Sequence, residues 1–162
     1  MQMSFDKPEE IEDTVKGKYL IFTIQNEEYA LEIRVVDEIL EMQPISEVPN
    51  LPAYIKGIIN LRGDIIPVMD LRLRFYKEFR EYDSRTAIIV VNIASTRLGL
   101  VADRANKVIF IEDSELIKPP EIKESDYNRF VTAICKTENK IKLVLDCEKI
   151  LTDHERTELT SF

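Results

Sequence analysis

The chain has 162 residues, a formal net charge of −8 and 44% hydrophobic residues, an apolar fraction that is ordinary for a globular protein and excludes a disordered or fibrous chain. The acidic total, with no long basic block, argues against nucleic acid as a partner, because binding to phosphate rests on lysine and arginine. No apolar run approaches the ~18 residues of a membrane span, and the first residues lack the apolar core of a signal peptide, so we expect a cytoplasmic protein without direct membrane insertion.

Acidic residues are concentrated at the two ends of the chain. Residues 1–16 hold five acidic and two basic residues, and residues 152–162 hold three acidic and one basic residue. This composition predicts a flexible acidic N-terminal tail over residues 1–16 and a C-terminal tail over residues 152–162.

Short β-type runs separated by turn signals make up the body of the chain. Gly63-Asp64 lies between two such runs and is interpreted as the two-residue turn of a hairpin. Pro67 lies inside the second of them and favours an edge strand or a bulge, because proline has no N–H to donate. The expected strands are residues 19–25, 29–33, 58–62, 65–70, 86–93, 98–102, 108–111, 132–136 and 141–146.

One segment, residues 34–42, has a helical pattern instead. Val35, Val36, Ile39 and Leu40 share one face at helical spacing, and a proline follows the segment. We therefore predict a short helix here, which makes the whole an all-β fold with short helices.

The sequence repeats itself at two spacings. Residues 30–33 resemble residues 99–102 at an offset of 69, and residues 65–70 resemble residues 141–146 at an offset of 76. Residues 57–60 and 133–136 are also related by 76. We predict two β-units of small-barrel size, residues 17–84 and 85–151, that share an apolar interface. Whether a strand from one unit completes the other is left open.

Some side chains recur between the units and others do not. Asp70 and Asp146 recur, and we interpret them as structural carboxylates that accept backbone N–H groups, with an acid–base pair as a minor alternative. Arg62 corresponds to Glu138, and Glu38 corresponds to Lys107. Arg62 is therefore either a solvated arginine paired with Glu38 or an interface arginine that faces a partner.

The residue types needed for common catalytic and metal sites are missing. The only histidine, His154, lies in the C-terminal segment, so no Ser-His-Asp or Cys-His set is expected in the folded body. Cys135 and Cys147 lack zinc-site spacing, and there is no glycine-rich phosphate loop. We expect a protein that is not an enzyme and that needs no cofactor or metal.

Residues 50–72, NLPAYIKGIINLRGDIIPVMDLR, resemble the core motif of the CheW family of bacterial chemotaxis coupling proteins, and the resemblance extends over about residues 17–151. It implies two SH3-like five-stranded β-barrels and a non-enzymatic adaptor that couples methyl-accepting chemoreceptors to the histidine kinase CheA. A similar coupling module for another receptor–kinase array, such as one for pilus motility, is the alternative.

The resemblance also implies which residues meet each partner. The receptor tip would lie in the groove between the barrels, and the kinase regulatory domain would bind near the 56–65 hairpin and a segment of the second barrel. The receptor-facing positions are Ile33, Val36, Glu38, Ile39, Gly57 and Arg62, and the kinase-facing positions are Lys56, Ile65, Lys118 and Ile122. We expect a monomer in isolation that reaches membrane-associated receptor arrays through these partners.

Overall fold

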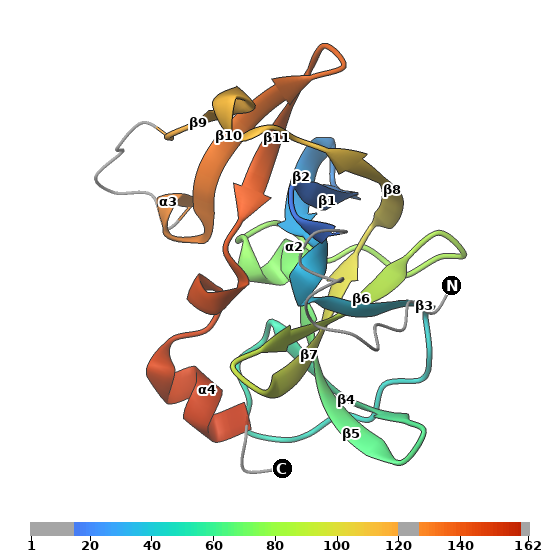
Figure 1. The fold of residues 1–162 in the computed structure, drawn as a ribbon. Coiled ribbons are helices and arrows are strands. Elements are labelled where there is room, and N and C mark those ends of the chain that lie inside the picture. Colours follow the sequence, from blue (N-terminus) through green and yellow to red (C-terminus); the bar gives the residue numbers. More distant parts are fainter. Residues whose placement is uncertain (1–14, 120–126, 160–162) are drawn as a thin grey trace.

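Two sheets, both built from strands of the two halves of the chain, form the protein in the computed structural model (Figure 1). The structure describes residues 15–119 and 127–159. A six-stranded sheet has the order β8-β1-β2-β11-β10-β9, and a five-stranded sheet has the order β3-β6-β7-β5-β4. The strands are β1 (Lys18–Ile24), β2 (Glu27–Glu32), β3 (Val36–Glu41), β4 (Ile55–Leu61), β5 (Asp64–Asp70), β6 (Ala87–Ile93), β7 (Thr96–Ala102), β8 (Arg104–Phe110), β9 (Leu116–Ile117), β10 (Val131–Thr137) and β11 (Lys140–Leu145). The short helices are η1 (Ile33–Val35), α2 (Leu71–Arg74), η2 (Asp113–Glu115), α3 (Tyr127–Phe130), η3 (Cys147–Lys149) and α4 (Asp153–Leu159). The predicted all-β fold with short helices is confirmed.

The strand register reproduces the sequence repeat. β5 runs parallel to β7 with Val68 opposite Gly99, and β11 runs parallel to β2 with Val144 opposite Ala30. These residues are related by the same offsets of 76 and 69. A third pairing also recurs. Ser46 forms a bridge with Ile58 of β4, and Ile117 of β9 pairs with Ile134 of β10, which is related to Ile58 by the offset of 76. The two sheets are therefore two copies of one small strand pattern.

The predicted boundary between residues 84 and 85 does not separate the two sheets. The β1–β2 hairpin belongs to the six-stranded sheet with β8 to β11, and the β6–β7 hairpin belongs to the five-stranded sheet with β3 to β5. Each half of the chain therefore contributes one complete β-hairpin to the sheet that is otherwise formed by the other half. Each exchanged hairpin is held by a parallel pairing, which requires a long crossover and so joins segments far apart in the chain.

The ends of the described chain are more ordered than the composition suggested. Residues 153–159 form helix α4, and Leu159 is buried in the main core, so this part of the predicted C-terminal tail is folded. Val15 is buried in the same core. Residues 1–14, most of the predicted acidic tail, lie outside the described part.

The predicted helix over residues 34–42 is wrong. Only η1 is helical there, and β3 follows as an edge strand paired with β6. Val36 and Glu38 are buried while Asp37 between them is half-buried, which is the alternation of a strand. The period-two pattern was hidden because the register shifts between Val36 and Glu38 and because the buried position 38 carries a carboxylate.

The β4–β5 turn lies one residue earlier than predicted. Leu61 pairs with Asp64, so the turn residues are Arg62 and Gly63, with φ of 53° and 92°. Positive φ at both positions is the type I′ geometry that matches strand twist. Pro67 lies in an interior strand, but β7 pairing begins only at Val68, next to a register shift in β4.

Three apolar clusters hold the sheets together. One cluster belongs to the five-stranded sheet and includes Ile59 and Val90, and another belongs to the six-stranded sheet and includes Ile21 and Val144. The largest cluster draws on both sheets and contains an aromatic series whose neighbouring ring centroids are 5.7, 5.3 and 5.6 Å apart. The members of the series are Phe22, Tyr29, Phe75 and Phe130. The expected interface between the units is this shared core.

Candidate functional site

Glu38 and Arg62 meet at the edge of the five-stranded sheet. Glu38 is 6% exposed on β3, and Arg62 lies in the β4–β5 turn with its side chain 57% exposed. Arg62 donates Nη2 to Glu38 Oε2 at 2.5 Å and Nη1 to Oε1 at 3.3 Å. The hydrogen bond to Glu38 raises the pKa of the Arg62 guanidinium. This arginine is therefore a solvent-facing cation held in a fixed orientation by a nearly buried carboxylate.

A second arginine, which the sequence reasoning missed, extends this pair into a network. Arg97 at the start of β7 places Nη1 3.1 Å from Asp64 Oδ2 and Nε 3.3 Å from Asp37 Oδ2. Its Nη2 lies 3.7 Å from Glu38 Oε2. Since β3, the β4–β5 turn and β7 each supply charges, the network depends on the exchanged β6–β7 hairpin.

Two ion pairs of this network recur in the six-stranded sheet with their charges reversed. Lys107 Nζ lies 2.7 Å from Glu138 Oε2, and Lys140 Nζ lies 3.3 Å from Glu28 Oε1. The repeat-related positions are Glu38 and Lys107, Arg62 and Glu138, Arg97 and Glu28, and Asp64 and Lys140. This reversal is the sequence signal from which Arg97 and Asp64 could have been found. Both sheets therefore form these two ion pairs at equivalent positions, but the positive and negative partners are exchanged.

The apolar receptor-facing candidates divide into buried and accessible residues. Ile33 and Val36 are buried in the shared core, and Ile39 is half-buried against it. Gly57 is buried at φ +145°, and a Cβ there would lie 2.0 Å from the carbonyl oxygen of Ser46. Gly57 therefore has a structural reason to be glycine. Contact of these four residues with a partner stays a prediction.

The kinase-facing candidates lie in different places. Lys56 near the start of β4 has Nζ 4.7 Å from the centre of the Phe79 ring, whereas Ile65, 48% exposed, lies beside the β4–β5 turn at the other end of the hairpin. Lys118 is exposed and follows Ile117, an exposed residue of β9 in the other sheet. Ile122 lies outside the described residues.

Asp70 and Asp146 cap the turns that follow their strands. Asp70 Oδ1 accepts the N–H of Arg72 at 2.9 Å, and Asp146 Oδ1 accepts that of Glu148 at 2.9 Å. Asp70 also accepts the hydroxyl of Tyr82 at 2.6 Å; burial and then this bond raise the pKa of Tyr82. Both interpretations as structural carboxylates are confirmed. Because the two carboxylates serve separate strand ends in different sheets, the acid–base alternative has no support.

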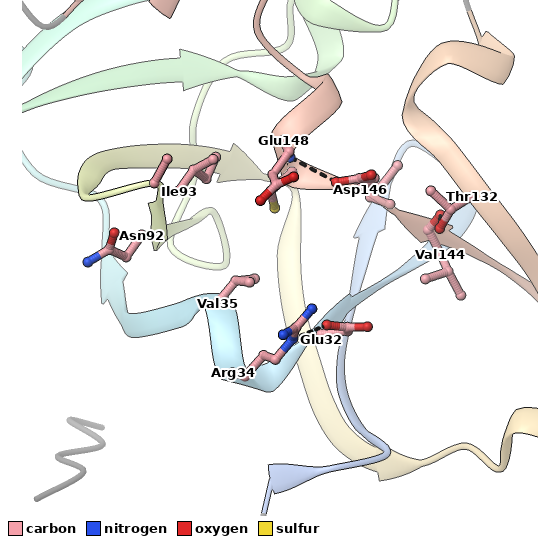
Figure 2. A pocket seen from close by; sticks show the side chains of 12 residues that line it. Glu32, Arg34, Val35, Asn92, Ile93, Thr132, Val144, Asp146 and Glu148 are labelled. Atoms are coloured by element: carbon pink, nitrogen blue, oxygen red, sulfur yellow. Dashed lines mark hydrogen bonds and ion pairs between the residues drawn. The ribbon is translucent and has the colours of Figure 1, made fainter. Parts of the chain in front are cut away.

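A crevice of about 230 Å³ lies where η1, the β6–β7 turn and η3 meet (Figure 2). Glu32, Asp146 and Glu148 line it together with Arg34, whose N–H donates to Glu32. The hydrogen bond to Glu32 raises the pKa of Arg34. We call this hollow the acidic crevice. Within residues 15–119 and 127–159, no group of three or more His, Cys, Asp or Glu side chains is arranged to hold a metal ion.

A family model described as the CheW-like domain matches residues 18–155. The chain belongs to the CheW family. It is 33% identical over 143 residues to the chemotaxis protein CheW of Klebsiella aerogenes, covering 88% of this chain and 86% of that protein. It is 34% identical over 134 residues to CheW of Bacillus subtilis, covering 83% and 86% of the two chains. The crystal structure of the scaffolding protein TtCheW from Thermoanaerobacter tengcongensis matches with a TM-score of 0.80 and 34% identity, over 86% of this chain and 94% of that one.

Membership of this family identifies a chemotaxis adaptor of the scaffold type, without catalytic activity. The predictions of the CheW family, the fold class and a non-enzymatic role are confirmed. None of the described helices has the length and apolar character needed to cross a membrane.

Proposed function

We propose that this CheW-family protein couples methyl-accepting chemoreceptors to the histidine kinase CheA. The face around Arg62, Glu38 and Ile39 would receive the receptor tip. Ile65 and Lys56 on the β4–β5 hairpin, together with Lys118 and Ile122 in the other unit, would meet the kinase regulatory domain. The protein would then reach receptor arrays at the membrane through these partners. The pilus-type alternative is not favoured, because the relatives are named chemotaxis proteins.

The orientation of Arg62 is the observation that carries the receptor proposal. A long side chain that is already fixed by Glu38 loses little conformational freedom when a partner binds. Its guanidinium stays more than half exposed and can donate to a carboxylate or carbonyl of a helical tip. Ile39, the next residue of β3, is only half-buried, so this edge strand also offers apolar surface to a partner.

The decisive experiment is a reconstitution of CheA with a receptor cytoplasmic fragment, with and without this protein. We expect receptor control of kinase activity only when the protein is present. Arg62→Ala should weaken binding to the receptor fragment by roughly 1–3 kcal/mol, as truncation of a central interface charge does, with less effect on CheA binding. Failure to bind either partner at micromolar concentration would exclude the proposal. Equal loss toward both partners would show that the substitution acts on folding instead.

A further inference from the structure

A second crevice, of about 200 Å³, lies between the β1–β2 turn, the start of β8 and the segment that precedes β6. Its lining includes Thr23, Asn26, Arg80, Arg85 and Arg104. We call it the arginine crevice. None of the residues proposed to meet the receptor or the kinase lines it, so its chemistry goes beyond the proposed function.

The two carboxylates of the arginine crevice, Asp83 and Asp103, already accept hydrogen bonds from the protein. Asp103 accepts both ends of the Arg72 guanidinium, at 2.8 and 2.7 Å, and the N–H of Gln25 at 2.7 Å. Burial opposes ionisation of Asp103, but these bonds outweigh it and lower its pKa. Asp83 accepts the N–H of Arg85 at 2.8 Å, which lowers its pKa. These bonds therefore hold both groups as anions, and Arg80 is the one arginine of the described lining that also pairs with them.

Three arginines keep donors available to the hollow. Arg80 lies 3.6 Å from the Asp83 carboxylate and 3.8 Å from that of Asp103, beyond hydrogen-bond length. Arg104 donates Nε to Thr23 Oγ1 at 3.4 Å, and its two terminal nitrogens remain available as donors. The Arg85 guanidinium has no hydrogen bond or ion pair to any residue within the described ranges. Since Thr23 Oγ1 accepts from Arg104 and Asn106, its own proton is free to be donated.

The arginine crevice has a repeat-related counterpart of opposite charge. By the offset of 69, Thr23, Asp103 and Arg104 of the arginine crevice correspond to Asn92, Arg34 and Val35 of the acidic crevice of Figure 2, so that a guanidinium in one stands where an apolar side chain lies in the other. The fold thus forms the same hollow twice, once with an excess of carboxylates and once with an excess of guanidinium groups. In a chain of net charge −8, the cationic copy does not follow from overall composition.

We propose that the arginine crevice is a binding site for a phosphate group. A tetrahedral oxyanion suits several guanidinium forks and a hydroxyl donor that converge from different elements, and arginine recognises phosphate by paired N–H bonds. Arg85 and Arg104 are the principal ligands, and Thr23 and Asn26 add neutral donors. The group is carried either by inorganic phosphate or by a phosphate monoester.

The test is an NMR titration of the full chain at constant ionic strength, with inorganic phosphate in one arm and O-phosphoserine in the other. We expect saturable shifts at the amides of Thr23, Asn26, Arg85 and Arg104. Arg85→Gln and Arg104→Gln should each weaken binding by about tenfold or more, the effect of losing a charge-assisted hydrogen bond. The tighter of the two ligands identifies the source of the phosphate group.

The matched control is Lys136→Gln, which removes the same charge from an exposed position on β10. This variant should titrate like the parent chain in both arms. If the two arginine variants also titrate like the parent, or if the shifts rise linearly without saturation in both arms, the site does not exist. Unchanged resonances elsewhere in each variant show that the fold is intact.

Discussion

The five-stranded and six-stranded sheets share their strand pattern but not their charges. Repeat-related residues occupy the parallel pairings of both sheets, with Val144 opposite Ala30 in one and Val68 opposite Gly99 in the other. The ion pairs of Arg62 and Arg97 nevertheless have reversed counterparts in those of Glu138 and Glu28. Apolar burial and register decide the fold, so surface charges can change sign without changing the backbone. Divergence of charge on a duplicated scaffold gives one chain two distinct surfaces.

The largest loss of stability is expected on substitution of Gly57, whose repeat-related position in the six-stranded sheet is not a glycine. Gly57 corresponds to Ala133, but only Gly57 combines positive φ with the close approach of Ser46. Gly57→Ala should lower the free energy of unfolding by about 3 kcal/mol or more, through backbone strain and steric overlap. Urea denaturation measures this, and Ala133→Gly is the control with a small effect. Similar losses for both variants would contradict the assigned difference.

The next effect concerns the contact that joins α2 to the segment after β11. Arg74 is buried, donates Nε to the carbonyl of Ile150 at 2.8 Å and stacks over Tyr54 at 4.5 Å. Arg74→Ile, which copies the residue type at the repeat-related position 150, leaves that carbonyl without its donor. We expect a loss of about 2 kcal/mol in denaturant unfolding. A loss below that of the exposed Lys136→Gln control would show that the arginine is dispensable.

Exchanging the positive and negative residues of the ion-pair network tests whether their arrangement matters for partner binding but not for folding stability. Arg62→Glu by itself places a second carboxylate against Glu38 and should lower the urea denaturation midpoint. The fivefold change Asp37→Asn, Glu38→Lys, Arg62→Glu, Asp64→Lys and Arg97→Glu copies the pairing of the six-stranded sheet, where the counterpart of Asp37 is Asn106. It should restore the denaturation midpoint while receptor-fragment binding, followed by pull-down, stays lost. Recovery of binding would mean that the partner does not recognise the charge of Arg62.

The smallest effect is expected in the core of the six-stranded sheet. Lys142 is fully buried on β11 and donates to the carbonyl of Thr137 at 3.0 Å, whereas its counterpart Ile66 is apolar. Lys142→Ile removes a buried charge from a site whose shape accepts isoleucine in the other copy. We expect stability to stay equal or rise by about 1 kcal/mol in thermal or urea unfolding. A clear destabilisation would show that the ammonium group contributes to the fold.

The sequence by itself determined the strands, the repeat and the capping carboxylates. Alternating apolar runs and turn residues located nine strands, and the repeat offsets of 69 and 76 reappear in the register. Asp70 and Asp146 were identifiable because a side chain that bonds to the next turn depends only on neighbouring residues. The motif around Gly57 and Arg62 was sufficient to indicate the family.

Only the tertiary structure decided which hairpin joins which sheet, and with it the charge network. The pairing of β11 with β2 and of β5 with β7 joins distant segments, and their energy leaves no trace in local propensity. Residues 36–41 became a strand because β6 was available as a partner, although their spacing fitted a helix. Arg97 met Glu38 only because the β6–β7 hairpin crossed into the other sheet. Local sequence preferences therefore determine most of the strands and turns of this protein, and long-range strand pairing determines which charged side chains meet on its surface.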